Sequence, residues 1–208
     1  MGKFVIYLLA AAAATVCLSS CGFVLGIEKA KYTVLEKEGA FEIRRYEPCI
    51  VADTVIESDF DEAGNVAFRR LYNYISGQNR AKETISMTAP VIQEVDSQKI
   101  AMTAPVGQQK LGDKWVVSFL MPSEYTMETL PEPLDANVVL KQVPERKMAA
   151  VRYSGTWSKK RYEQHREKLK EFIGQRGLTI TGEYIFARYD PPFQIFFLRR
   201  NEVLIPVE

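Results

Sequence analysis

The sequence predicts an α+β domain made of two pseudo-two-fold-related halves, each with one helix between pairs of strands. Three observations lead to this fold class: stretches of alternating apolar and polar residues, two amphipathic helical stretches, and a repeat of the whole pattern after 98 residues. The chain has 208 residues, of which 47% are hydrophobic and 25% are charged. This is the balance of a globular protein that is long enough to bury a core.

Three strands are predicted at the start of the first half. Residues 32–36, 41–46 and 49–52 alternate between apolar and polar side chains, and the turn-forming residues Gly39 and Pro48 separate them.

A helix follows these strands. Ser58 or Asp59 can cap its first turn, and the apolar periodicity continues to about Ser76, where Gly77 provides a stop. The residues expected to face the core recur at spacings of three and four: Gly64, Ala67, Leu71, Tyr74 and Ile75.

The second half follows the same plan. A charged helix is expected from Ser158 to Gly174 or Gly177. Strands are expected before and after it, at 138–140, 148–151, 183–189, 195–199 and 202–207.

The two halves can be aligned residue by residue. A shift of 98 residues places Leu71 on Leu169 and Ala52 on Ala150, and likewise Tyr74 on Phe172 and Ile75 on Ile173. Any two amphipathic helices can be slid into partial agreement, but here the strands agree together with the helix. We therefore expect one domain with an internal two-fold.

A shorter repeat is also present. Residues 85–91 (ISMTAPV) recur as 100–106 (IAMTAPV), with six of seven residues identical. A hairpin that turns at 96–97 would place Met87 opposite Val106 and Val91 opposite Met102. We favour a role in closing the sheet, and the alternative is a pair of methionines that line an apolar site.

The N-terminus has the pattern of an export signal. Lys3 precedes an uncharged apolar run, and Leu18-Ser19-Ser20-Cys21 resembles the lipobox of bacterial lipoproteins. This implies a signal peptide over 1–20 and an acylated Cys21 that carries palmitate-type chains, followed by a tether over 21–31. The protein would then be anchored in the cell envelope facing the periplasm, with the outer membrane favoured. The alternative is an uncleaved signal anchor over 4–27.

Cysteine usage agrees with export. Cys17 would leave with the signal and Cys21 would carry lipid, so Cys49 would have no partner for an intramolecular disulfide. We expect Cys49 to be a small hydrophobic residue in a strand. A reactive or haem-ligating thiol is the alternative.

Several function classes find no support in the sequence. With 27 basic and 26 acidic residues there is no basic excess for nucleic acid. The single histidine, His165, lies on a charged helical stretch, and no phosphate-binding loop or nucleophile motif occurs. The residues alone therefore indicate an exported binding domain that is not an enzyme.

Five motifs together resemble one known family. The doubled I-x-M-T-A-P-V, with 41–46 (FEIRRY), 74–79 (YISGQN), 189–192 (YDPP) and 200–203 (RNEV), is similar to the SOUL haem-binding family. The resemblance indicates a domain over 32–208. It implies a distorted antiparallel β-barrel of two pseudo-symmetric halves, each with one flanking helix.

The resemblance also implies a ligand and a place for it. Family members bind haem or related tetrapyrroles in a shallow apolar site along one helix, with basic groups near the propionates. Here Phe68 and Tyr72 would form an aromatic surface for the porphyrin, with Arg69 or Arg70 near a propionate. The positions implied as haem-binding are Asn65, Phe68, Arg69, Arg70, Tyr72, Asn73 and Gln194.

The chain also departs from the family pattern. Asn73 and Gln194 replace basic residues, and Arg45 stands where some members have a histidine proposed as axial ligand. His165 lies on the other helix, so we expect it to be a half-exposed packing residue rather than an iron ligand. Haem would then bind weakly or transiently, without a protein metal ligand.

The function expected from these features is to carry or buffer haem at the cell envelope without catalysis. Two alternatives remain. The same two-fold architecture resembles effector-binding domains for apolar small molecules, and the domain could also bind another envelope protein.

Overall fold

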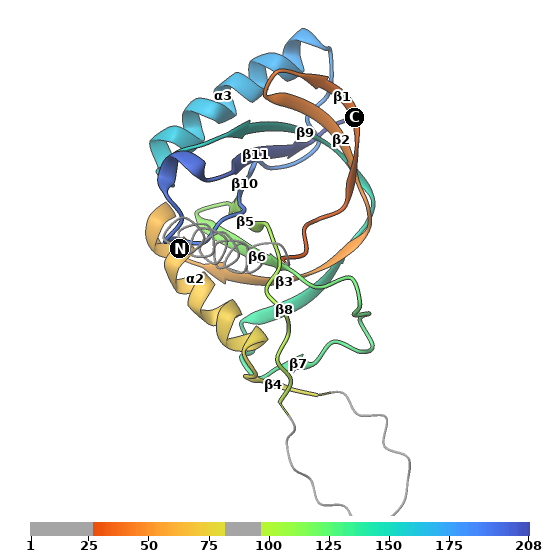
Figure 1. Cartoon of the computed structure of the whole chain (residues 1–208), viewed down its shortest axis with the longest axis vertical. Coiled ribbons are helices and arrows are strands. Elements are labelled where there is room, and N and C mark those ends of the chain that lie inside the picture. The colour runs from red at the N-terminus through yellow and green to blue at the C-terminus, as the bar shows by residue number, and fades with distance from the viewer. Residues whose placement is uncertain (1–26, 82–96) are drawn as a thin grey trace, which may run out of the picture.

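The computed structural model describes residues 27–81 and 97–208, and these form a curled antiparallel sheet with two helices (Figure 1). The sheet has nine strands in the order β1-β2-β9-β11-β10-β5-β6-β3-β8 and bends into a barrel-like shell. The strands are β1 Tyr32–Glu38, β2 Phe41–Tyr46, β3 Cys49–Ile56, β5 Val106–Leu111, β6 Lys114–Leu120, β8 Val138–Val143, β9 Arg146–Tyr153, β10 Ile185–Arg188 and β11 Asn201–Pro206. A small second sheet pairs β4 (Asn79–Arg80) with β7 (Glu132–Pro133).

The strand order confirms the predicted pseudo-two-fold. Equivalent strands of the two halves follow one another in the same order on either side of the central β5–β10 pair: β6 and β11 come next, then β3 and β9, then β8 and β2. Helix α2 (Phe60–Ile75) follows β3, and α3 (Lys159–Gln175) follows β9. One strand of each half pairs with the other half, β2 with β9 and β8 with β3. This exchange joins the halves into one sheet.

Helix α2 begins and ends as its sequence predicts. The Asp59 carboxylate accepts hydrogen bonds from the backbone N–H groups of Asp61 and Glu62, at 3.0 and 2.8 Å. Gly77, with φ of 118°, follows the end of the helix. The predicted core stripe of α2 is buried in full.

The residues matched by the 98-residue shift are buried in both helices. Ser158 caps α3 through Arg161 N–H. Leu169, Phe172 and Ile173 lie in the core with their α2 counterparts, and Ala52 and Ala150 are both fully buried. The internal repeat is therefore a repeat of packing as well as of sequence.

One predicted strand is wrong. Residues 195–199 form a turn around the short 3₁₀ helix η2 (Phe196–Leu198) and belong to neither sheet of the described chain. The backbone hydrogen bonds here are local, from Leu198 N–H to the Ile195 carbonyl and from Arg199 N–H to the Phe196 carbonyl. The run is continuously apolar without the alternation of a half-buried strand, and its side chains face solvent.

Residues 27–31, predicted to end a tether, pack against the body of the domain. The Ala30 N–H donates to the Ala104 carbonyl at 3.0 Å, and the Ala104 N–H donates to the Glu28 carbonyl at 2.8 Å. This segment therefore pairs with the second copy of the heptapeptide repeat.

Two other predictions fall outside the described residues. The signal peptide with Cys21 lies within 1–26, and the first copy of the heptapeptide lies within 82–96, so the expected hairpin with its Met87 and Val91 contacts stays a prediction. In the described ranges, no helix has both the length and the apolar character needed to cross a membrane.

Two sequence motifs meet in a buried ion network. Arg44 of the 41–46 motif donates from Nη1 and Nη2 to the carboxylate of Glu202 in the 200–203 motif, at 2.7 and 3.0 Å. Arg200 and the Tyr189 hydroxyl donate to the same carboxylate at 2.8 and 2.9 Å. Burial alone would raise the pKa of Glu202, but the hydrogen bonds and charges of Arg44 and Arg200 outweigh it and lower the pKa.

Candidate functional site

A groove of about 410 Å³ lies beside α2. Its walls come from α2, from residues 102–106 before and at the start of β5, and from the turn that follows β10. The volume lies within the range of small-molecule sites, and the lining is mainly apolar. The lining residues are Ile27, Gly64, Asn65, Phe68, Arg69, Tyr72, Met102, Thr103, Ala104, Val106, Trp157, Arg188, Tyr189, Asp190, Pro191 and Pro192.

Two aromatic rings with nearly parallel planes line this groove. Phe68 and Tyr72 lie one turn apart on α2, and their ring planes are 11° from parallel with centroids 6.0 Å apart. The Phe68 ring packs edge-on against Phe119, at 5.3 Å between centroids. Both α2 rings remain exposed on their outer side, so they offer an apolar surface to a planar ligand.

A nearly buried cation, Arg188, also lines the groove. Its Nη2 donates to Gln108 Oε1 at 2.6 Å, while its Nε has no hydrogen-bond partner among the described residues. No carboxylate of the described chain forms an ion pair with it. Burial lowers the pKa of Arg188 to about 10, although the charge of Asp61 opposes this effect. Arg188 is therefore a cation at neutral pH that has donor capacity left for a ligand.

A glycine in the middle of α2 makes room for this guanidinium. A Cβ atom on Gly64 would lie 2.7 Å from Arg188 Nη2, which is closer than van der Waals contact permits. Glycine weakens a helix interior by about 1 kcal/mol relative to alanine. Here it allows Arg188 to lie against the helix backbone.

Four of the seven predicted site residues line the groove: Asn65, Phe68, Arg69 and Tyr72. Arg70 does not, because its guanidinium donates to Thr54 Oγ1 at 2.9 Å and pairs with Asp135 at 3.1 Å.

Asn73 and Gln194 are also absent from the lining. Asn73 is exposed. Gln194 lies in the turn after β10, where its carbonyl accepts a hydrogen bond from Arg199 Nε at 2.8 Å. The groove contacts that we expected of Gln194 come from residues 189–192 of the same turn instead.

The main feature missed from the sequence is Arg188. Residues 185–188 read Ile-Phe-Ala-Arg, so the alternation of a strand places Arg188 on the same face as the fully buried Phe186. A charged residue at a core-facing strand position is the signal that could have identified it. Trp157 was likewise not expected at this site, whereas Met102 lines an apolar groove, as the alternative interpretation of the heptapeptide repeat proposed for it.

His165 lies away from the groove lining. Its Nδ1 is 2.8 Å from the Arg161 carbonyl, and its ring stacks on Tyr153 with centroids 3.7 Å apart. Burial lowers the pKa of His165, which favours the neutral ring. The residue is half-buried in packing contacts, as expected.

The equivalent face of α3 has a different chemistry. The 98-residue shift places Tyr162, Arg166 and Lys170 where α2 has Gly64, Phe68 and Tyr72. Tyr162 is buried against Phe60 and Phe186. On α3 a large side chain therefore stands at the position where α2 has the glycine that leaves space open. Arg166 pairs with Glu167 on the surface. The aromatic wall of the groove is therefore not repeated on α3.

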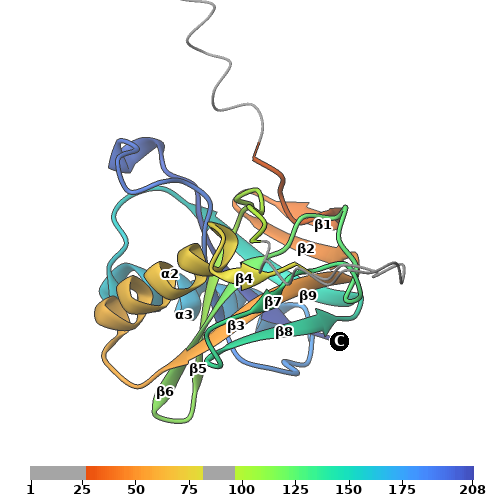
Figure 2. The same ribbon diagram turned by 90° about the horizontal axis from the view of Figure 1, so that it is seen from below.

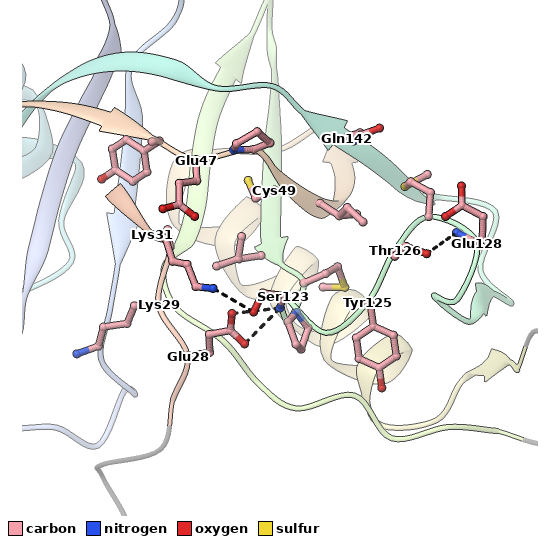
Figure 3. A pocket seen from close by; sticks show the side chains of 18 residues that line it. Glu28, Lys29, Lys31, Glu47, Cys49, Ser123, Tyr125, Thr126, Glu128 and Gln142 are labelled. Atoms are coloured by element: carbon pink, nitrogen blue, oxygen red, sulfur yellow. Dashed lines mark hydrogen bonds between the residues drawn. The ribbon is translucent and has the colours of Figure 1, made fainter. Parts of the chain in front are cut away.

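A second pocket of about 320 Å³ lies near the start of β3 (Figure 3). Two of its charged groups have local partners: Lys31 Nζ donates to Ser123 Oγ at 3.5 Å, and the Glu28 carboxylate accepts from Ser123 N–H at 3.1 Å. Cys49 lies in β3 as predicted, and burial raises the pKa of its thiol, which favours the neutral form. The α2 groove is the stronger candidate because it combines an apolar wall with an unpaired cation.

Comparisons with known proteins relate the chain to one family. The model of the SOUL heme-binding protein family matches residues 27–206. Heme-binding protein 1 of Xenopus tropicalis is 30% identical over 170 residues, which is 81% of this chain and 84% of that protein. Heme-binding protein 2 of Homo sapiens is 28% identical over 167 residues, covering 79% of this chain and 77% of that protein.

Solved structures support the fold. The EcmrR C-terminal domain superposes with a TM-score of 0.58 at 12% identity, covering 85% of this chain and 98% of that one. A hydrolase from Listeria innocua superposes with a TM-score of 0.54 at 13% identity, covering 84% and 94%. At this level of identity the likeness concerns the fold alone.

Proposed function

The chain belongs to the SOUL heme-binding protein family, and from this premise we propose that it binds haem or a related tetrapyrrole non-covalently in the α2 groove. The observation that carries the proposal is Arg188, a cation without an ion-pair partner in the described chain that lines a mainly apolar groove. A porphyrin with propionate groups combines a planar apolar body with carboxylates, and these are the two features that the groove complements.

The residues of the groove have separate roles in this proposal. Phe68 and Tyr72 would contact the porphyrin face, and Arg188 would hold a propionate, with Arg69 at the rim. Met102, Tyr72 and Tyr189 of the lining carry side-chain atoms of types that can donate to haem iron, and the Tyr189 hydroxyl already donates to Glu202. Bound haem would supply a redox-active iron with a characteristic absorption spectrum.

We further propose that the protein carries or buffers its ligand at the cell envelope, without transforming it. The names of its relatives describe binding. A groove whose aromatic wall is half-exposed suits exchange of a weakly held ligand. Anchoring would come from acylation of Cys21 after removal of residues 1–20. Mass spectrometry of the processed N-terminus, compared with Cys21→Ala, tests the anchor separately.

A second candidate is a different apolar carboxylate. The aromatic wall and Arg188 would also accommodate other flat amphiphilic anions, as the effector-binding interpretation expects. The two probes used below therefore share the porphyrin ring and differ in whether its propionates are free or esterified.

The deciding experiment is a titration of the detergent-purified full chain with ferric protoporphyrin and with its dimethyl ester. Absorbance near the Soret band and quenching of tryptophan fluorescence report binding. Arg188→Met is expected to weaken binding of the diacid at least tenfold and to leave binding of the ester within twofold. Arg152→Met, at an exposed position on β9, is the matched control. Equal affinity of wild type and Arg188→Met for the diacid would contradict the proposal, as would the absence of saturable binding by the wild type.

A further inference from the structure

The turn after β10 presents an exposed cluster of large apolar side chains. Phe193 is 86% exposed, and the other large apolar side chains of the turn are each more than half exposed. In Figure 2 this turn stands away from the shell at the upper left, in the blue of the C-terminal part of the chain. We call it the apolar tip, which consists of Phe193, Ile195, Phe196, Phe197 and Leu198.

Hydrogen bonds at the base of the tip hold its backbone in this arrangement. Arg199 donates from Nε to the Gln194 carbonyl at 2.8 Å and from Nη2 to the Pro192 carbonyl at 2.6 Å. Its guanidinium lies 4.4 Å from the centre of the Trp157 ring. The Gly155 N–H donates to the Phe196 carbonyl at 2.9 Å. The backbone is thus tied to the body of the domain while the apolar side chains point to solvent.

Five large apolar side chains exposed together mark an interaction site in soluble domains, so we expect the apolar tip to contact a partner. Residues 191–198 (PPFQIFFL) carry no charge. A convex, uncharged tip rich in phenylalanine has the shape and chemistry to enter the interface of a lipid bilayer, where apolar area is buried without a complementary groove.

The place where the described chain begins favours a lipid bilayer as the partner of the apolar tip. Ile27, the first described residue, lines the same groove as Pro191 and Pro192. Residues 4–26 before it contain no charged side chain, and this also holds for residues 21–26, which would remain after removal of residues 1–20. In Figure 2 the described chain starts at the upper side of the molecule, the side on which the tip also stands out. The described chain therefore begins on the same side as the apolar tip, and the sequence before it is uncharged.

We propose that the apolar tip inserts into the interface of a lipid bilayer and so turns the α2 groove toward the membrane surface. The proposal requires neither acylation of Cys21 nor haem binding, since it depends only on the exposed side chains and on where the chain enters the fold.

The test uses the full chain reconstituted in phosphatidylcholine vesicles whose acyl chains carry bromine, a quencher of tryptophan fluorescence. Phe193→Trp places a reporter in the tip, and Leu111→Trp places one on another exposed apolar residue, at the end of β5. The wild type gives the contribution of Trp115 and Trp157. We expect quenching of the added F193W fluorescence to be at least threefold that of L111W. Equal quenching of the two would overturn the proposal.

A second variant separates insertion from protein contact. Phe193→Ser with Phe197→Ser changes only exposed side chains, so folding should be retained. Hydrogen exchange of 193–198 should slow at least fivefold when vesicles are added to the wild type. A wild type that is dimeric in detergent by light scattering, and monomeric in the double variant, would overturn the proposal in favour of an interface between copies. Haem titration of the double variant reports on the proposed function independently.

Discussion

Two arginines of this domain, the buried Arg44 and the half-buried Arg188, have opposite electrostatic surroundings. Arg44 is 1% exposed and forms a bidentate pair with Glu202, with the hydroxyl of Tyr46 as a further partner. Arg188 lies in the groove wall with a neutral partner, Gln108, and with an Nε that the described residues leave unpaired. Hydrogen bonds to Glu202 overcome the effect of burial and raise the pKa of Arg44, whereas burial lowers the pKa of Arg188.

The difference shows where to look for function in this fold. Arg44 lies in one of the motifs that identify the family, yet its charge is compensated inside the protein, so we assign it to stability. Arg188 lies in none of those motifs, and its charge is left for a partner outside the protein. A half-buried charged side chain without an ion-pair partner in the described chain is thus the better indicator of the binding site.

The largest expected effect distinguishes the two arginines by stability. Arg44→Met would leave the buried Glu202 carboxylate with Arg200 as its one cation, and removal of one partner from a buried pair costs about 3–5 kcal/mol of unfolding free energy. Arg188→Met removes an uncompensated charge and one hydrogen bond, so its unfolding free energy should stay within about 1 kcal/mol of the wild type. Urea unfolding of both variants measures this. Similar losses of unfolding free energy in Arg44→Met and Arg188→Met would contradict this difference between the two arginines.

The second prediction concerns pH. The folded-state pKa of Glu202 lies below the ordinary value of 4.5, so the stabilisation by Glu202 is complete above that pH and is lost as the pH falls through the folded pKa. Glu202→Gln removes this contribution. The difference in unfolding free energy between wild type and variant should therefore be largest at pH 7 and shrink below about pH 4.5. A difference that is constant from pH 7 to pH 3 would show that Glu202 does not titrate with unfolding.

The third prediction compares the corresponding faces of the two helices. Phe68→Ala and Tyr72→Ala should each weaken haem binding about three- to tenfold, because each removes part of the apolar surface against which the porphyrin would pack. Lys170→Ala, at the α3 position that corresponds to Tyr72, is the matched control and should leave the affinity unchanged. Spectroscopic titration measures all three. An equal effect of the α3 variant would place the ligand elsewhere.

Much of the fold could be predicted because local and repeated signals agree. The cap at Asp59, the stop at Gly77 and the buried stripe of α2 each follow from residue type and spacing. The 98-residue repeat predicts the corresponding core residues of α3. The strand expected at 195–199 is wrong because a short apolar run does not reveal whether it is buried in a sheet or exposed in a turn.

The groove could be predicted only in part. Residues one turn apart on a single helix, such as Phe68 and Tyr72, can be identified from spacing alone. The turn after β10 and the α2 helix are brought together by the tertiary fold, so Gln194 was expected in the lining where residues 189–192 are found. Arg70 was paired with the wrong partner for a similar reason, since Asp135 is distant from it in sequence.

The smallest expected effect belongs to the only histidine. Its ring stacks on Tyr153, and its Nδ1 is 2.8 Å from the Arg161 carbonyl, so both its face and one nitrogen have partners within α3 and β9. Because His165 is also absent from the groove lining, His165→Ala should leave haem affinity within twofold and the position of the Soret band unchanged. Its effect should be confined to stability, at about 1–2 kcal/mol for the lost stacking and buried area. If the variant instead loses a six-coordinate spectrum that the wild type has, the iron is held at α3. In that case the unpaired charge of Arg188 does not mark the binding site.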